Sequence, residues 1–340
     1  MPPRLSPDIY IQGIRQGDRI ILSRAITLIE SSLPKDQALA SEVIQGILPY
    51  IGNSLRIGIT GVPGVGKSTF IEAFGNHITS LGKKLAVLTI DPSSQRSYGS
   101  ILGDKTRMET LVNQPLAYVR PSPSGSSLGG VARSTRQSIL LCEAAGYEVI
   151  FIETVGVGQS ETTVHGMVDF FLLLMLAGAG DELQGIKRGI MEMADAIAIT
   201  KADGSNIMAA RQARASYQNA LHLMPPTESG WIPPVHTCSA LTGDGIKELW
   251  QMLEEYVNLS NQNRFLHKKR QDQNLNWLHE TIRQELETAF YQNPSTKQQI
   301  PHIEQSISSG EITALSGAQK LLQTYFTHYS TSHRSSDGDS

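Results

Sequence analysis

The sequence predicts an α/β fold with a doubly wound, mostly parallel sheet and helical arms at both ends. From Leu55 to about residue 240, short apolar runs alternate with amphipathic stretches, a pattern typical of parallel strands joined by crossover helices. Outside this region the apolar residues recur at helical spacing. With 340 residues, the chain is long enough to bury a sizeable core.

The first fifty residues carry apolar side chains at helical spacing, for example Ile20, Ala25 and Leu28, and contain the helix breakers Pro34 and Pro49. We therefore expect a helical N-terminal arm over residues 1–50. The predicted nucleotide-binding domain covers residues 51–258. Its expected strands are LRIGIT, KLAVLTID, LAYVR, YEVIFIE, VDFFLLLML, DAIAIT and PVHTCSA.

The most apolar run, residues 168–179, is roughly half the length that a transmembrane helix needs, so we interpret it as a strand buried on both faces. After residue 258 the strands stop. Two amphipathic segments, residues 273–292 and 309–326, predict a helical C-terminal arm over residues 259–326. The polar, serine-rich residues 327–340 are predicted to be disordered.

Composition narrows the functional classes. A formal net charge of −3 gives no electrostatic reason to expect nucleic acid or an anionic membrane as a partner. The N-terminus lacks the basic-then-apolar pattern of a secretory signal, so we expect a soluble, cytoplasmic protein. The two cysteines, Cys142 and Cys238, lie far apart without metal-ligand spacing and are expected to be buried small hydrophobes.

The strongest motif is GVPGVGKS, which fits the P-loop pattern G-x-x-x-x-G-K-[ST] between a predicted strand and a predicted helix. In such a loop the backbone N–H groups surround the phosphates, Lys67 reaches the β- and γ-phosphates, and Ser68 offers its hydroxyl to Mg²⁺. The sequence thus predicts a P-loop nucleotide hydrolase. The predicted phosphate-binding residues are Gly61, Val62, Pro63, Gly64, Val65, Gly66, Lys67, Ser68 and Thr69.

A second element is ETVG, in which Glu153 and Gly156 have the spacing of the D-x-x-G motif that senses the γ-phosphate. A carboxylate at the end of this strand can hold Mg²⁺, and the Gly156 N–H can bind the γ-phosphate. Glu153 as an ordinary paired carboxylate is the alternative. Val157 stands where Ras-like enzymes carry the glutamine that orients the attacking water, so slow intrinsic hydrolysis is expected.

The segment TKAD resembles the base-recognition motif N-K-x-D, with Thr200 in place of asparagine, followed by Lys201 and Asp203. The Asp203 carboxylate can accept hydrogen bonds from guanine N1–H and the 2-amino group, which adenine does not offer in that arrangement. Farther on, Ser239, Ala240 and Leu241 match the loop whose backbone supports the guanine oxygen. In this order the motifs favour GTP over ATP.

Two further loops are candidate switches. Asp91 ends the second predicted strand and is a second candidate ligand for Mg²⁺, with the capping of the turn before Pro92 as the alternative role. The polar loop from Gly178 to Gly189 contains Lys187 and Arg188, which can reach a nucleotide or a partner, although an exposed helix face explains them equally well.

Five segments together resemble the MeaB/ArgK family of G-protein chaperones of cobalamin-dependent methylmalonyl-CoA mutase. They are GVPGVGKSTFIEAFG, IDPSSQRSYGSILGDKTRM, ETVGVGQSE, GAGDELQGIKRGIMEMADAIAITKADG and SALTGDGIKELW. The resemblance covers about residues 10–290. It implies a SIMIBI-type G domain over residues 51–258, homodimers formed partly through the C-terminal arm, and an acyl-CoA mutase as partner, whose cofactor loading and protection depend on GTP.

Carried over to this sequence, the resemblance makes Ser68, Asp91 and Glu153 the Mg²⁺ neighbourhood and the loop that contains Lys187 an additional, catalytically relevant switch. Two other functions remain alternative hypotheses. One is a kinase-type ATPase linked to basic amino-acid transport, although no aspartate stands as an evident substrate base. The other is a metallochaperone GTPase, a class that usually carries Cys or His motifs, which this sequence lacks outside the sparse histidines of its tail.

Overall fold

A computed structural model describes residues 3–52, 54–90, 108–120, 128–154, 160–178, 188–225 and 227–334. By its internal contacts the chain divides into two compact units, residues 1–273 and 274–340. The first unit contains the whole sheet together with the helices that cover it. None of the helices in the described part of the chain is long and apolar enough to span a membrane.

The described strands form one seven-stranded sheet in the order β3-β2-β4-β1-β5-β6-β7, and every pair in it is parallel. This confirms the predicted doubly wound fold. Strand β1 is central, with Ile57 opposite both Phe151 of β4 and Phe170 of β5. The strands are β1 (Leu55–Gly61), β2 (Leu85–Ile90), β3 (Ala117–Arg120), β4 (Val149–Thr154), β5 (Phe170–Leu176), β6 (Ala196–Thr200) and β7 (Val235–Thr237).

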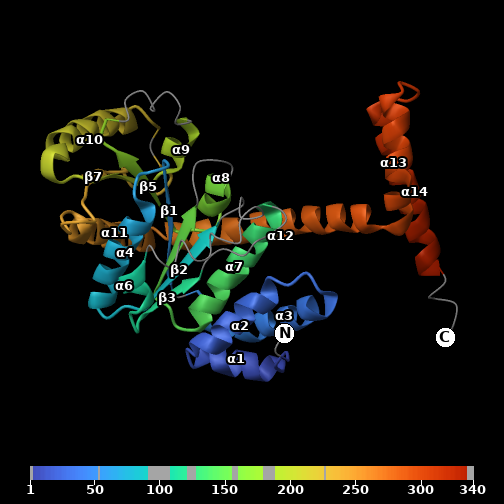
Figure 1. The fold of residues 1–340 in the computed structure, drawn as a ribbon, viewed down its shortest axis with the longest axis horizontal. Coiled ribbons are helices and arrows are strands. Elements are labelled where there is room, and N and C mark those ends of the chain that lie inside the picture. Colours follow the sequence, from blue (N-terminus) through green and yellow to red (C-terminus); the bar gives the residue numbers. More distant parts are fainter. Residues whose placement is uncertain are drawn as a thin grey trace. The chain divides into compact units, whose positions relative to one another are not determined.

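One face of the sheet packs against α4 (Lys67–Ser80), α6 (Glu109–Val112), α10 (Ile207–His222) and α11 (Ile246–Gln262), as Figure 1 shows. Phe74 of α4 stacks on Phe151 of β4 at 5.5 Å between ring centroids and meets Trp250 of α11 edge-on. Such aromatic contacts add to the burial of the strands' apolar side chains. Between β5 and β6 lies the short helix α9 (Arg188–Met193), and a 3-10 turn, η3 (Gly204–Asn206), precedes α10.

The opposite face packs against α7 (Leu128–Ala144) and α8 (Ser160–His165), and α7 is covered by three N-terminal helices (Figure 1). These are α1 (Pro7–Arg15), α2 (Arg19–Ile29) and α3 (Pro34–Ile47), followed by the 3-10 turn η1 (Leu48–Tyr50). Their helical character agrees with the sequence. Tyr10, Leu22 and Val43 of these helices share a buried core with Ile150 and Ile152 of β4.

The C-terminal helices are α12 (Phe265–Gln292), α13 (Pro294–Ser308) and α14 (Ala314–Arg334). Within the second unit α13 and α14 pack closely: a Cβ at Gly317 would lie 2.8 Å from Ile303 and 2.9 Å from Ile307. Helix α14 continues past residue 327, where the sequence predicts disorder. Extending a formed helix costs little, and no glycine or proline interrupts residues 327–334.

Candidate nucleotide-binding site

The loop between β1 and α4 carries the P-loop motif at the carboxyl end of the central strand, where ligands bind in doubly wound sheets. Gly64 and Gly66 have φ angles of +77° and +88°, which side chains other than glycine rarely adopt. Gly61 is required for a different reason, since a Cβ there would lie 2.5 Å from the Leu174 carbonyl oxygen of β5. Within the loop, the side chains of Val62 and Val65 are buried.

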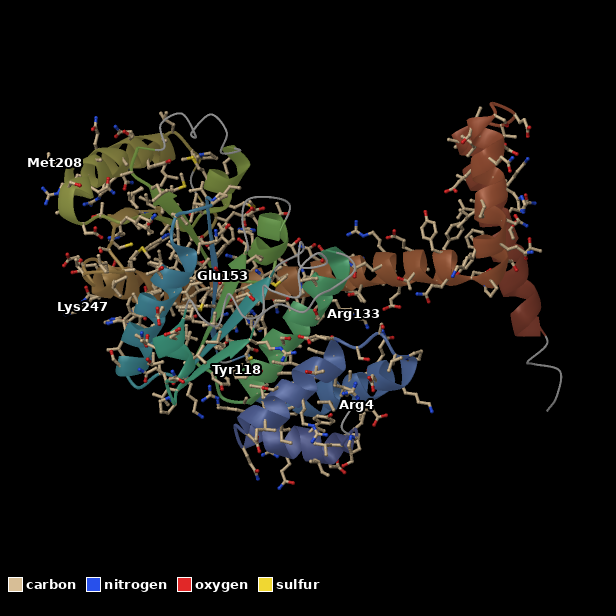
Figure 2. All side chains as sticks on the ribbon, in the orientation of Figure 1. Arg4, Tyr118, Arg133, Glu153, Met208 and Lys247 are labelled. Carbon is tan, nitrogen blue, oxygen red and sulfur yellow. The ribbon has the colours of Figure 1, made fainter. Side chains whose placement is uncertain are left out.

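Lys67 begins α4, and its ammonium group donates a hydrogen bond to the Gly61 carbonyl at 3.0 Å. Burial lowers the pKa of Lys67, while the carboxylates of Glu153 and Glu161 oppose this shift. Glu153 lies near the end of β4, paired with Ile59 of β1 and Thr89 of β2, and is almost fully buried (Figure 2). The phosphate loop and two buried acids therefore share one electrostatic environment.

The segment after β6 is tied directly to the phosphate loop. The Thr200 hydroxyl lies 2.8 Å from the Val65 carbonyl oxygen, and the Lys201 ammonium donates to the Gly64 carbonyl at 2.8 Å. Lys201 adopts a left-handed conformation with φ of +56°, and the Asn206 side chain donates to its carbonyl. These contacts hold the two loops together although they lie about 135 residues apart in the sequence.

Asp203 and Ser239 meet through a hydrogen bond from the Ser239 hydroxyl to the Asp203 carboxylate. The same hydroxyl oxygen accepts the N–H groups of Leu241 and Thr242, each at 3.2 Å. A backbone bond from the Ala202 N–H to the Cys238 carbonyl, 3.0 Å long, also joins the two loops. The TKAD and SAL motifs thus form one surface, beside which the Leu241 side chain is largely exposed.

Three predicted site residues, Asp91, Gly156 and Lys187, lie outside the described residues. Ser68 and Thr69 occupy the first turn of α4. Sequence reasoning assigned no role to Glu161, a buried residue at the start of α8 whose charge acts on Lys67. A signal was present, because Glu161 closes the ETVGVGQSE segment. Both cysteines are buried and unpaired, as predicted.

A family model described as "Methylmalonyl Co-A mutase-associated GTPase MeaB" matches residues 22–295. The chain belongs to this MeaB family. Its P-loop and parallel sheet are therefore those of a GTPase family, and the resemblance inferred from the motifs is confirmed.

Relatives of this MeaB-family chain share most of its length. "GTPase ArgK" of Escherichia coli is 44% identical over 94% of this chain and 96% of its own. "Methylmalonic aciduria type A homolog, mitochondrial" of Mus musculus is 44% identical over 94% of this chain and 79% of its own. A crystal structure described as "LAO/AO transport system kinase" superposes with a TM-score of 0.75 at 37% identity, covering 95% of this chain and 98% of that one.

Proposed function

We propose that this protein binds GTP with Mg²⁺, hydrolyses the γ-phosphate, and uses the two nucleotide states to regulate a cobalamin-dependent acyl-CoA mutase. The observation that carries the proposal is the convergence of four motifs at one edge of the sheet: the phosphate loop, Glu153, Asp203 and Ser239. Membership of a mutase-associated GTPase family supports the partner.

In this proposal the backbone N–H groups of residues 61–69 surround the phosphates, and the Lys67 ammonium leaves the Gly61 carbonyl to bind them. In the free protein, burial disfavours the charged form of Lys67. A bound triphosphate would bring negative charge close to the ammonium group and thereby stabilise its charged form. Glu153 and Glu161 keep a compensating negative charge nearby. The Ser239 hydroxyl fixes the Asp203 carboxylate so that it faces the donors of the guanine edge.

The residues present fit Mg²⁺. This ion usually takes one or two protein oxygens together with phosphates and water. Within the described part of the chain no group of three or more His, Cys, Asp and Glu forms a protein-only metal site, whereas Ser68 and Glu153 supply oxygens of the kind that Mg²⁺ prefers. When bound, the ion would neutralise charge on the transferred phosphoryl group. Asp91 remains a proposed additional ligand, and Lys187 and Gly156 remain proposed contacts to the phosphates.

The first test is phosphate release from GTP and from ATP, with and without purified methylmalonyl-CoA mutase holding cobalamin. We expect slow turnover of GTP alone, because Val157 replaces the water-orienting glutamine, and faster turnover with the mutase. Equal rates of ATP and GTP hydrolysis would refute the proposed guanine specificity. A rate of GTP hydrolysis that does not change when the mutase is added would refute the proposed partner.

Asp203 provides a separate test of base recognition. Asp203→Asn should shift the preference from GTP towards XTP, since the 2-carbonyl of xanthine needs a donor where guanine offers one. Competition against a fluorescent nucleotide measures both affinities. Asp244→Asn is the matched control: Asp244 lies in the neighbouring loop and pairs with Thr242. Unchanged GTP selectivity in Asp203→Asn would show that the base is read elsewhere.

The second candidate function is that of a kinase. It is favoured by the description of the similar crystal structure as an "LAO/AO transport system kinase". A kinase transfers the γ-phosphate to an acceptor and does not release it to water. Incubation with γ-labelled GTP or ATP and basic amino acids distinguishes the two, because only a kinase would move the label into the amino acid.

We also propose that the protein is a homodimer that associates through its second unit. Four apolar residues of α12 recur at helical spacing and are between 47% and 61% exposed: Leu275, Leu278, Ile282 and Leu286. Together they form an apolar stripe. A stripe of this spacing is typical of helix surfaces that pack against another helix.

A further inference from the structure

The Thr200 hydroxyl faces two carbonyl groups. It lies 2.8 Å from the carbonyl oxygen of Val65 in the phosphate loop and 3.3 Å from that of Met175 in β5, and Thr200 is only 4% exposed. A hydroxyl has a single proton to donate. Whichever carbonyl accepts the hydrogen bond, the hydroxyl proton is used within the protein and is not available to a bound nucleotide.

This arrangement limits what Thr200 can read on a base. The N7 and O6 atoms of guanine are both hydrogen-bond acceptors and so require donors. Thr200 has no donor left, whereas Asp203 offers a carboxylate that matches the donors N1–H and 2-amino on the other edge. Of these two residues, therefore, only Asp203 can distinguish guanine.

Thr200 instead acts on the phosphate loop. Its neighbour Lys201 donates to the Gly64 carbonyl, so residues 200 and 201 hold two successive carbonyl groups of the loop. Val65, whose carbonyl Thr200 binds, is itself almost completely buried. Loss of the hydroxyl would leave that carbonyl without its partner on β6.

Building on the proposed GTP site, we propose that Thr200 is a positioning residue for the phosphate loop and that N7 of the base is not read. Nucleotides of 7-deazaguanine, in which a C–H replaces N7, are then accepted as GTP is. The base site is selective at the N1 and 2-amino positions and indifferent at N7.

The test is equilibrium binding of GTP, 7-deaza-GTP and ATP to the full chain, by competition against a fluorescent guanine nucleotide. In the wild type we expect the affinities for GTP and 7-deaza-GTP to agree within about twofold, since a missing hydrogen bond would cost about fivefold or more. Thr200→Val should weaken both by the same factor, about fivefold, and Thr200→Ser should restore both.

A wild-type preference for GTP over 7-deaza-GTP of fivefold or more would overturn the proposal. So would a Thr200→Val variant that weakens GTP much more than 7-deaza-GTP, because the hydroxyl would then contact N7. If Thr200→Val does not fold, the wild-type comparison decides alone. The measurement with ATP distinguishes failure of the proposed GTP site from failure of this inference. Equal affinity for ATP and GTP would refute the guanine site itself. A preference for GTP over both ATP and 7-deaza-GTP would refute only the inference that N7 is not read.

Discussion

The ammonium group of Lys67 combines a buried position, a backbone acceptor and two nearby carboxylates. A charged donor to phosphate is worth roughly twice a neutral one. Lys67→Ala should therefore weaken nucleotide binding by at least about 100-fold. Titration with a fluorescent guanine nucleotide measures this, and Lys83→Ala is the control because Lys83 precedes β2 at the other end of the sheet. Unchanged binding by Lys67→Ala would contradict the phosphate-loop assignment.

His165 of α8 makes stability depend on pH. Burial, together with the charge of Lys269, lowers the pKa of His165 from 6.5 to about 4. Between these values the unfolded chain binds a proton that the folded protein does not. The free energy of unfolding should therefore fall as the pH drops from 6.5 to 4, by about 3 kcal/mol at most, and be restored above pH 6.5.

Urea unfolding at several pH values measures this slope. His165→Gln should flatten it across that window, because glutamine does not titrate. The matched variant His222→Gln, at an exposed position at the end of α10, should leave it unchanged. An identical slope in the wild type and His165→Gln would assign the pH dependence to other groups.

At the scale of elements, hydrogen bonds and an ion pair connect the beginning of α12 to the residues that precede β1 and β5. Arg270 donates to both oxygens of the fully buried Asp169, at 2.7 and 2.6 Å, and to the Gly52 carbonyl at 2.7 Å. Asp169 also accepts the backbone N–H of Arg56. Lys269 donates to the Asp169 carbonyl, so two successive side chains of α12 hold the same residue.

Removing one partner of a buried ion pair leaves the other uncompensated. Arg270→Ala should therefore lower the free energy of unfolding by about 3 kcal/mol or more. Lys268→Ala is the control on the same helix, because its pair with Glu228 is mostly exposed and worth less than about 1 kcal/mol. Denaturant unfolding compares the two variants, and equal losses would mean that the Asp169 pair contributes no more than a surface pair.

The elements of the fold differ in how far the sequence could predict them. Strand positions and the phosphate loop were predictable, because apolar runs and the glycine spacing are local signals. The contact between Thr200 and Val65 and the pair between Arg270 and Asp169 were not, since each joins residues about 100 or more apart in sequence. Glu161 closes the ETVGVGQSE segment, which marks its neighbourhood as functional, but the sequence does not show that its charge acts on Lys67.

At the scale of the whole molecule, the proposed dimer depends on the apolar stripe of α12. Ile282→Glu should convert the dimer to a monomer, because a charge would be buried between two apolar surfaces. Light scattering after gel filtration gives the mass in solution. Gln284→Glu adds a charge two residues farther on, on the opposite side of the helix, and should keep the dimer. A wild-type monomer, or a dimer that survives Ile282→Glu, would exclude this interface.

The strand order also governs how the chain folds during synthesis. Central β1 is the first strand made, yet it pairs only with β4 and β5, so residues up to Leu176 must leave the ribosome before its two neighbours are complete. Before residue 154 has emerged, β1 has neither of these partner strands complete, and before residue 144 has emerged, the helices α1 to α3 lack the complete α7 surface against which they pack. Such late, long-range pairing slows folding and exposes apolar segments to aggregation. The nascent protein should therefore depend on chaperones that bind it before the nucleotide site exists.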